Sequence, residues 1–263
     1  MTDLAYGVAI ALYLVAGLLG WITRRDRRYA RSLLALLSLG ALAQAAGFVD
    51  LHLQDPPIPL ESFSAALALI AWLTVVAYLL SLGARRFRGM AMWVGGGAAL
   101  ITAAAELGLR LAEPIRGAAP PAGAWPHAHV LLSAAGFSLL GLASLAGIAY
   151  LTKEGELKRK SGPQIALPSL ESLDRVEHLT LVIGFPLLTL GVVTGFVWGL
   201  DRGLGPWSGH AFWTLGAWAV YLVPIGMRVV RRQHGPRPAR GVVVSFAVLA
   251  FAYIGVRLLG GII

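Results

Sequence analysis

Long apolar runs, separated by short polar segments rich in arginine, form the main pattern of this chain. Each run has roughly twenty residues, the length that an α-helix needs to cross about 30 Å of hydrocarbon. The runs do not alternate apolar and polar residues as the strands of a membrane barrel do. We therefore predict an all-α, polytopic membrane helix bundle. The expected eight spans are approximately Leu4–Ile22, Ala30–Asp50, Ser62–Gly83, Met90–Leu111, His129–Thr152, Leu179–Leu200, Ala211–Val230 and Gly241–Ile262.

The basic residues fall in alternate segments between these runs. Eighteen of the 22 lysines and arginines lie in the segments that follow the first, third, fifth and seventh runs or within a few residues of those segments. Because basic segments stay in the cytoplasm, this bias predicts that both termini lie outside. The first run has no basic residue before it and is followed by "RRDRR", so we expect it to remain as a helix rather than to be a cleaved signal. The four exceptions are Arg110, Arg116, Arg202 and Arg257.

Composition agrees with a protein whose main partner is the lipid bilayer. Hydrophobic residues make up 57% of the chain and charged residues 13%, with a mean hydropathy of +0.71. The absence of cysteine excludes disulfides, thiolate metal sites, cysteine nucleophiles and covalent haem attachment through the chain's own thiols. Topology explains the net charge of +9, so we expect no nucleic-acid partner. No nucleotide-binding or common hydrolase motif is present, and we expect residues 1–263 to form a single membrane domain.

The longest inner segment, residues 153–178, is too polar to enter lipid. Its second half, "PSLESLDRVEHL", has apolar residues at near-helical spacing, with Ser169 or Ser172 as the N-cap. We predict a short interfacial helix that leads into the sixth span. Such a helix is either a plain surface element or a cytoplasmic docking site.

Two features inside the spans have a structural and a functional interpretation. Glu106 and Arg110 are four residues apart on one helix, which predicts an ion pair or, alternatively, a group that binds an anion. The glycine run "WVGGGAAL" at residues 93–100 permits close helix packing, or it breaks a helix as in transporters.

Histidines and tryptophans gather in the segments predicted to lie outside. A neutral imidazole is a good ligand for haem iron, and broad aromatic surface suits the porphyrin plane. The alternative is that the tryptophans anchor the helices at the membrane interface. The candidate residues are His52, His127, His129, His210, Trp125, Trp198, Trp207, Trp213 and Trp218.

One long stretch of the chain resembles the integral-membrane cytochrome c assembly family, which includes CcsA, CcmC and HemX proteins. It begins "WPHAHVLLSAAGF" and ends "LPSLESLDRVEHLTLVIGFPLLTLGVVTGFVWG". In that family a histidine precedes a helix of small residues, an inner loop ends in a Pro-Ser-Leu-Glu-like segment, and the next helix closes with Gly and Trp. The upstream run "PPIPLESFSAALALIAWLTVVAYLL" is also similar to the family pattern.

The segment "GPWSGHAFWTLGAW" at residues 205–218 resembles the tryptophan-rich outer motif of the family, but its polar centre differs. Trp207, Trp213, Trp218 and Tyr221 keep the spacing. Ser208 stands in the place of the motif's Asp, and His210 in that of its Lys. His129 matches the first flanking histidine, whereas Gln44 and Gly226 occupy positions where the family has histidines. His52 is a candidate substitute for the first of these.

The resemblance implies a membrane protein that handles haem for cytochrome c biogenesis. Haem b would lie on the extracytoplasmic face, held by His129, His210, His52 and the tryptophans Trp198, Trp207, Trp213 and Trp218, with His129 and His210 as iron ligands. Apocytochrome c and other cytochrome c biogenesis membrane proteins would be partners, and the location a bacterial inner membrane. Such a protein is a haem chaperone or transfer component rather than a stand-alone enzyme.

Two other functions remain open. One is regulatory: HemX-like members are associated with the control of glutamyl-tRNA reductase abundance, which requires a cytoplasmic contact. Its variant is an assembly scaffold that binds no haem. A transporter of another small molecule would need a polar midplane site with broken helices.

Overall fold

The computed structural model describes residues 2–23, 29–54, 58–81, 90–111, 124–159, 167–201 and 209–259. Within these ranges the chain is helical without strands, and eight spans are long and apolar enough to cross a membrane. The predicted all-α class and number of spans are confirmed. That both termini face outside stays a prediction from the basic segments. The elements are α1 (Thr2–Ile22), α2 (Ala30–Leu53), α3 (Phe63–Ser81), α4 (Ala91–Leu111), α5 (Ala124–Lys158), α6 (Leu170–Asp201), α7 (Gly209–Val220), α8 (Leu222–Ile225), the π-helix η3 (Gly226–Val230) and α9 (Pro236–Leu259).

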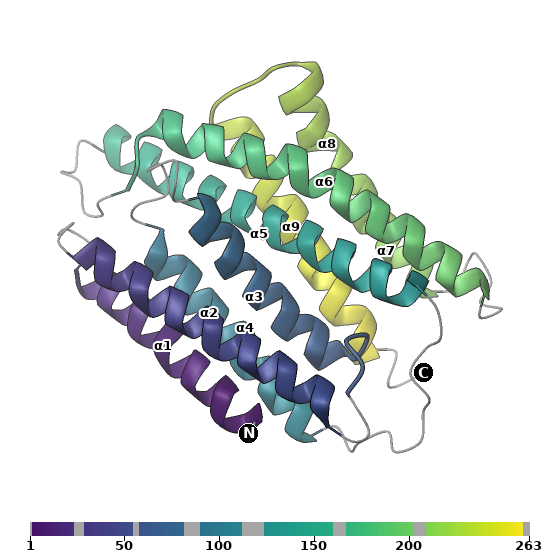
Figure 1. The fold of residues 1–263 in the computed structure, drawn as a ribbon. Coiled ribbons are helices and arrows are strands. Elements are labelled where there is room, and N and C mark those ends of the chain that lie inside the picture. The colour runs from purple at the N-terminus through teal and green to yellow at the C-terminus, as the bar shows by residue number, and fades with distance from the viewer. Residues whose placement is uncertain are drawn as a thin grey trace. The chain divides into compact units, whose positions relative to one another are not determined.

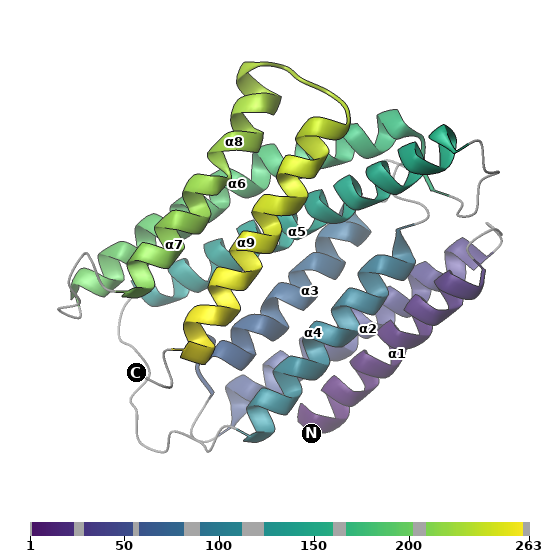
Figure 2. The same ribbon diagram turned by 180° about the vertical axis from the view of Figure 1, so that it is seen from behind.

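The helices form two compact units, which are described separately. The first unit comprises residues 1–122 and 159–169. In it α1 lies against α2 and α4, and α3 lies against α4 and α2 (Figures 1 and 2). Glycines allow the closest approach: a Cβ added at Gly17 would lie 2.9 Å from the backbone nitrogen of Gly96. The glycine run therefore serves helix packing, and α4 continues through it without a break.

A buried polar network lies among the helices of the first unit. The side chain of Gln44 is fully buried and joins three other helices. Its Oε1 accepts a hydrogen bond from the Tyr13 hydroxyl at 3.0 Å, and its Nε2 donates to the Ala68 carbonyl at 3.0 Å and lies 3.4 Å from the Thr102 hydroxyl. Each amide atom thus has a partner, as a buried polar group requires. Gln44 is a structural residue of this unit.

The second unit, residues 123–158 and 170–263, is built on a long antiparallel pair, α5 and α6. Helix α9 lies against α5, and α7 lies against α9 and α6 (Figures 1 and 2). A Cβ added at Gly136 of α5 would lie 2.5 Å from the Leu188 nitrogen, and one added at Gly184 of α6 would lie 2.9 Å from the Leu139 Cβ. These glycines set how closely α5 and α6 approach each other.

Two boundaries differ from the sequence prediction. The predicted interfacial helix is not separate, because α6 runs without interruption from Leu170, directly after the predicted cap Ser169, to Asp201. The seventh span is not one continuous helix but is divided into α7, α8 and η3. Pro224 has no N–H to donate to the carbonyl of Val220, and the Ser245 hydroxyl lies 3.4 Å from that oxygen instead.

A buried ionic cluster fixes this divided span to α6. The Arg228 side chain on η3 is fully buried, and it donates to Glu177 at 2.7 Å and to Asp174 at 2.6 Å. Asp174 also accepts from the Gly235 backbone at 3.3 Å and lies 2.7 Å from His234 Nδ1. The sequence prediction missed this cluster, because Glu177 was placed in a polar inner segment rather than in a buried helix face. The predicted Glu106–Arg110 ion pair is confirmed at 2.6 Å.

Candidate functional site

The candidate site is built around His129, at the end of the second unit that is predicted to face outside. Helix α5 begins at Ala124, so His129 lies within the helix rather than at its first residue as predicted. Pro126 is accommodated in the first turn, where a backbone N–H would have no helical partner. The rigid helix rather than a loop therefore positions the His129 side chain.

The His129 imidazole is oriented by a backbone carbonyl of the neighbouring helix. Its Nδ1 lies 2.8 Å from the carbonyl oxygen of Gly191 on α6. A carbonyl oxygen only accepts hydrogen bonds, so Nδ1 carries the proton and Nε2 of the neutral ring keeps its lone pair. Metal-binding histidines are commonly fixed in this way by a hydrogen bond from the other ring nitrogen. The arrangement leaves Nε2 as the nitrogen that can bind a metal.

Two glycines of α6 make room for the first turns of α5, and one of them makes room for His129 itself. A Cβ added at Gly195 would lie 2.5 Å from His129 Nδ1, and one added at Gly191 would lie 2.8 Å from the Ser133 backbone nitrogen. Both contacts are shorter than side chains allow, so residues larger than glycine would displace the imidazole or separate α5 from α6. The sequence prediction missed both glycines, although "GVVTG" is a small-residue pattern that indicates close helix packing.

Trp198 of α6 lies beside His129. The two ring centroids are 5.9 Å apart, and the ring planes are inclined by 40°. Both side chains are half-buried. The structure therefore brings together one candidate ligand and one candidate aromatic residue of the predicted set, from the start of α5 and the end of α6.

Trp218 lies deeper in the second unit than His129 and Trp198. Its Nε1 donates to the Thr189 hydroxyl at 2.9 Å, and its ring stacks on Phe185 at 5.8 Å. Thr189 precedes Trp198 by nine residues on α6, which is roughly 13 Å along the helix axis. Trp218 therefore packs inside the unit, and Trp213 on the same helix is 49% exposed.

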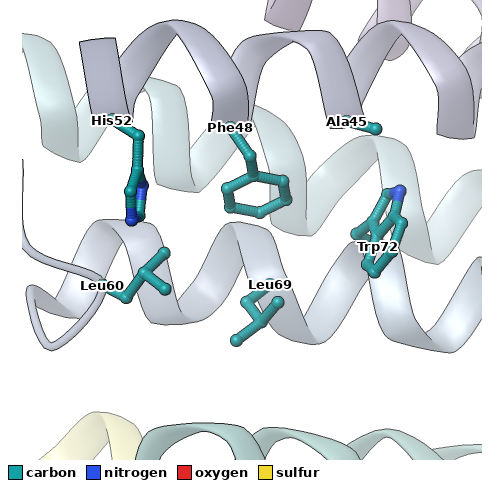
Figure 3. A pocket seen from close by; sticks show the side chains of 6 residues that line it. All are labelled: Ala45, Phe48, His52, Leu60, Leu69 and Trp72. Carbon is teal, nitrogen blue, oxygen red and sulfur yellow. The ribbon is translucent and has the colours of Figure 1, made fainter. Parts of the chain in front are cut away.

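Three further candidates have side chains that lie outside the described part of the second unit. Trp207 and the side chain of His210 lie outside the described residues. His52 belongs to the first unit, where it is exposed near the end of α2 and lines a groove with Phe48 and Trp72 (Figure 3). The roles predicted for these three residues stay predictions.

The donor set suits haem better than a bare metal ion. Among the described residues, no three histidine, aspartate or glutamate side chains lie together as a metal-binding group. Haem would bring four nitrogen ligands of its own, so the protein would supply only the remaining iron ligands, and the oriented His129 imidazole would be one of them. His129 Nε2, with Trp198 beside it, fits that requirement.

Comparison with known proteins shows the family to which the chain belongs. The model of the cytochrome C assembly protein family matches residues 60–263, which include all of the second unit. The chain belongs to this family. A cytochrome c biogenesis protein CcsA from Parasynechococcus marenigrum is 28% identical over 289 residues, covering 99% of this chain and 94% of its own length. One of the same name from Mesostigma viride is 29% identical over 160 residues, covering 52% of each, and one from Thermosynechococcus vestitus is 38% identical over 92 residues, covering 34% of this chain and 29% of its own.

Membership in the cytochrome c assembly family makes the chain a multi-pass membrane protein of cytochrome c biogenesis. From the family resemblance, histidines would be expected at positions 44 and 226 as well as at position 129. The structure shows that Gln44 has its amide fully engaged in the core of the first unit, and that Gly226 begins the π-helix η3. Of these three positions, His129 alone offers an imidazole.

Proposed function

We propose that this protein handles haem for cytochrome c biogenesis and holds haem b at the outer end of its second unit, with His129 Nε2 as an iron ligand. The observation that carries the proposal is the 2.8 Å hydrogen bond from His129 Nδ1 to the Gly191 carbonyl. It orients the imidazole and leaves the nitrogen that iron requires free of hydrogen. The half-buried Trp198 ring would supply apolar surface for the porphyrin edge.

The role of the chain is to bind and to orient. Haem supplies vinyl groups, to which the thiols of an apocytochrome c add to form thioethers. Gly195 leaves space for the imidazole, the Gly191 carbonyl accepts the hydrogen bond from its Nδ1–H, and the α5–α6 pair fixes both at one end of the unit. We place the protein in a bacterial inner membrane, with apocytochrome c and other biogenesis membrane proteins as partners and His210 as the second ligand.

The test is a visible spectrum of the detergent-purified protein, oxidised and reduced, with pyridine haemochrome quantitation. We expect a Soret band with about one haem per chain, which His129→Ala weakens strongly. The matched control is His127→Ala, because His127 is an exposed histidine of the same helix. An absence of haem after haem-replete expression, or equal bands in the two variants, would reject the proposal and leave the regulatory or scaffold function.

The second ligand is tested separately. His210→Ala should change the haem spectrum and shift the midpoint potential of the haem, because an iron ligand influences both. A spectrum and potential identical to wild type would exclude His210 as an axial ligand while leaving the His129 result unaffected.

A further inference from the structure

An apolar groove in the first unit is unused by the proposed haem site. It lies between α2 and α3, has a volume of about 290 Å³, and is lined by Ala45, Phe48, His52, Leu60, Leu69 and Trp72 (Figure 3). Ala45, Phe48 and His52 come from one face of α2, since they are three and four residues apart. The volume is near the lower end of the range of about 300 to 1,000 Å³ typical of ligand pockets.

The described floor of the groove is aromatic. The Phe48 and Trp72 rings are 6.2 Å apart in an edge-to-face arrangement, and Tyr6 continues this row at 6.1 Å from Phe48. The Trp72 Nε1–H is already donated to the Ala41 carbonyl at 2.9 Å. A ligand in the groove therefore meets flat apolar surface along most of its length.

Among the described lining residues, His52 supplies an imidazole at one end of the groove. In Figure 3 its ring descends from α2 toward Leu60, with Phe48 between it and Trp72. The imidazole is exposed and can donate a hydrogen bond to a group at the mouth of the groove. The lining thus matches a molecule with a small polar head and an apolar body.

The charged residues at this end of the first unit determine which polar head group a ligand of the groove can carry. Among the described residues, the same end of the first unit carries four carboxylates and Arg110, and Arg110 is paired with Glu106 at 2.6 Å and with Asp3 at 4.0 Å. Haem has two anionic propionates, which this acidic surface would repel. A neutral head with hydrogen-bond acceptors avoids that repulsion. The four carboxylates are Asp3, Asp50, Glu61 and Glu106.

We propose that this groove binds an isoprenoid quinone, a neutral membrane molecule. A ring carbonyl accepts a hydrogen bond from His52, the ring packs on Phe48, and the chain runs along Leu69 and Trp72 toward the lipid. The groove shares no residue with the haem site proposed around His129, Gly191, Gly195 and Trp198, and the proposal does not depend on that site.

The test is a titration of the full-length, detergent-purified protein with decylubiquinone, followed by quenching of tryptophan fluorescence and by equilibrium dialysis. We expect saturable binding of about one quinone per chain. Ala45→Leu should weaken binding at least about tenfold, because its side chain fills the groove. Ala46→Leu is the matched control, since the neighbouring Ala46 is exposed on another face of α2 and should leave binding unchanged.

His52→Leu keeps the proposal testable if Ala45→Leu fails to fold, because His52 is exposed and is not needed for packing. Loss of one hydrogen bond should weaken binding by about threefold to tenfold. Equal affinity in wild type, Ala45→Leu and His52→Leu would overturn the proposal. So would displacement of the quinone by decanol at equal concentration, which would indicate a lipid chain, or by haemin with a Soret band that depends on His52.

The two proposals fail independently. Loss of the Soret band in wild-type protein would reject the haem site while decylubiquinone binding continued. Loss of quinone binding would reject the groove while the His129-dependent Soret band continued.

Discussion

Replacing Arg228 with methionine should destabilise the second unit strongly. The Arg228 and Glu177 side chains are both fully buried and lie 2.7 Å apart. Glu177 Oε2 has no hydrogen-bond partner among the described residues, so the guanidinium is the only group that compensates this carboxylate. Removing one partner of a buried ion pair costs about 3 to 5 kcal/mol, because the other charge stays buried. At about 2 to 4 °C per kcal/mol, the thermal midpoint should fall by about 6 to 20 °C.

The measurement is thermal unfolding of the purified protein in one detergent, followed by circular dichroism. Arg231→Met is the control, because Arg231 is exposed three residues further along. Combining Arg228→Met with Glu177→Leu should recover most of the loss, since apolar residues often replace a buried pair at little cost. If the Arg228→Met midpoint equals that of Arg231→Met, the cluster does not hold η3 to α6 and the reasoning is wrong.

Two further substitutions test the helix contacts. Gly195→Ala should lower haem content by displacing the His129 ring, whereas Gly216→Ala should not, because a Cβ at Gly216 meets nothing within 4 Å; equal pyridine haemochrome yields would contradict this. Gln44→Leu should cost about 1 to 3 kcal/mol of unfolding free energy by leaving buried hydrogen-bond partners unpaired. Denaturant unfolding that matches Leu42→Ala, a change at a 67% exposed position of the same helix, would count against it.

The sequence predicted the helical class and the eight spans well, because lipid leaves the backbone no partner except its own carbonyls. The start of α5 was placed too late, and Leu170–His178 was predicted as a separate interfacial helix rather than as the first turns of α6. Both Ala124–Ala128 and Leu170–His178 continue the helices beyond the predicted spans. Hydropathy reports what enters lipid, and helix boundaries follow local hydrogen bonding instead.

The pattern of apolar residues also could not predict that the seventh span is divided into α7, α8 and η3. Pro224 signals a missing hydrogen bond, but the response of the chain depends on its neighbours. Here Ser245 of α9 lies 3.4 Å from the freed Val220 carbonyl, and Arg228 on η3 binds α6. Both partners are remote in sequence, so no local rule identifies them.

By itself the sequence determined a cysteine-free membrane bundle, the alternation of its basic segments, and the histidines and tryptophans worth considering, because each depends on residue type and local spacing. Tertiary structure decided which of them meet. His129 and the Gly191 carbonyl are 62 residues apart, and only the packing of α5 on α6 brings them within 2.8 Å. That contact selects the imidazole nitrogen that carries the proton, because a hydrogen bond depends on where two groups lie in space rather than on how they are spaced along the chain.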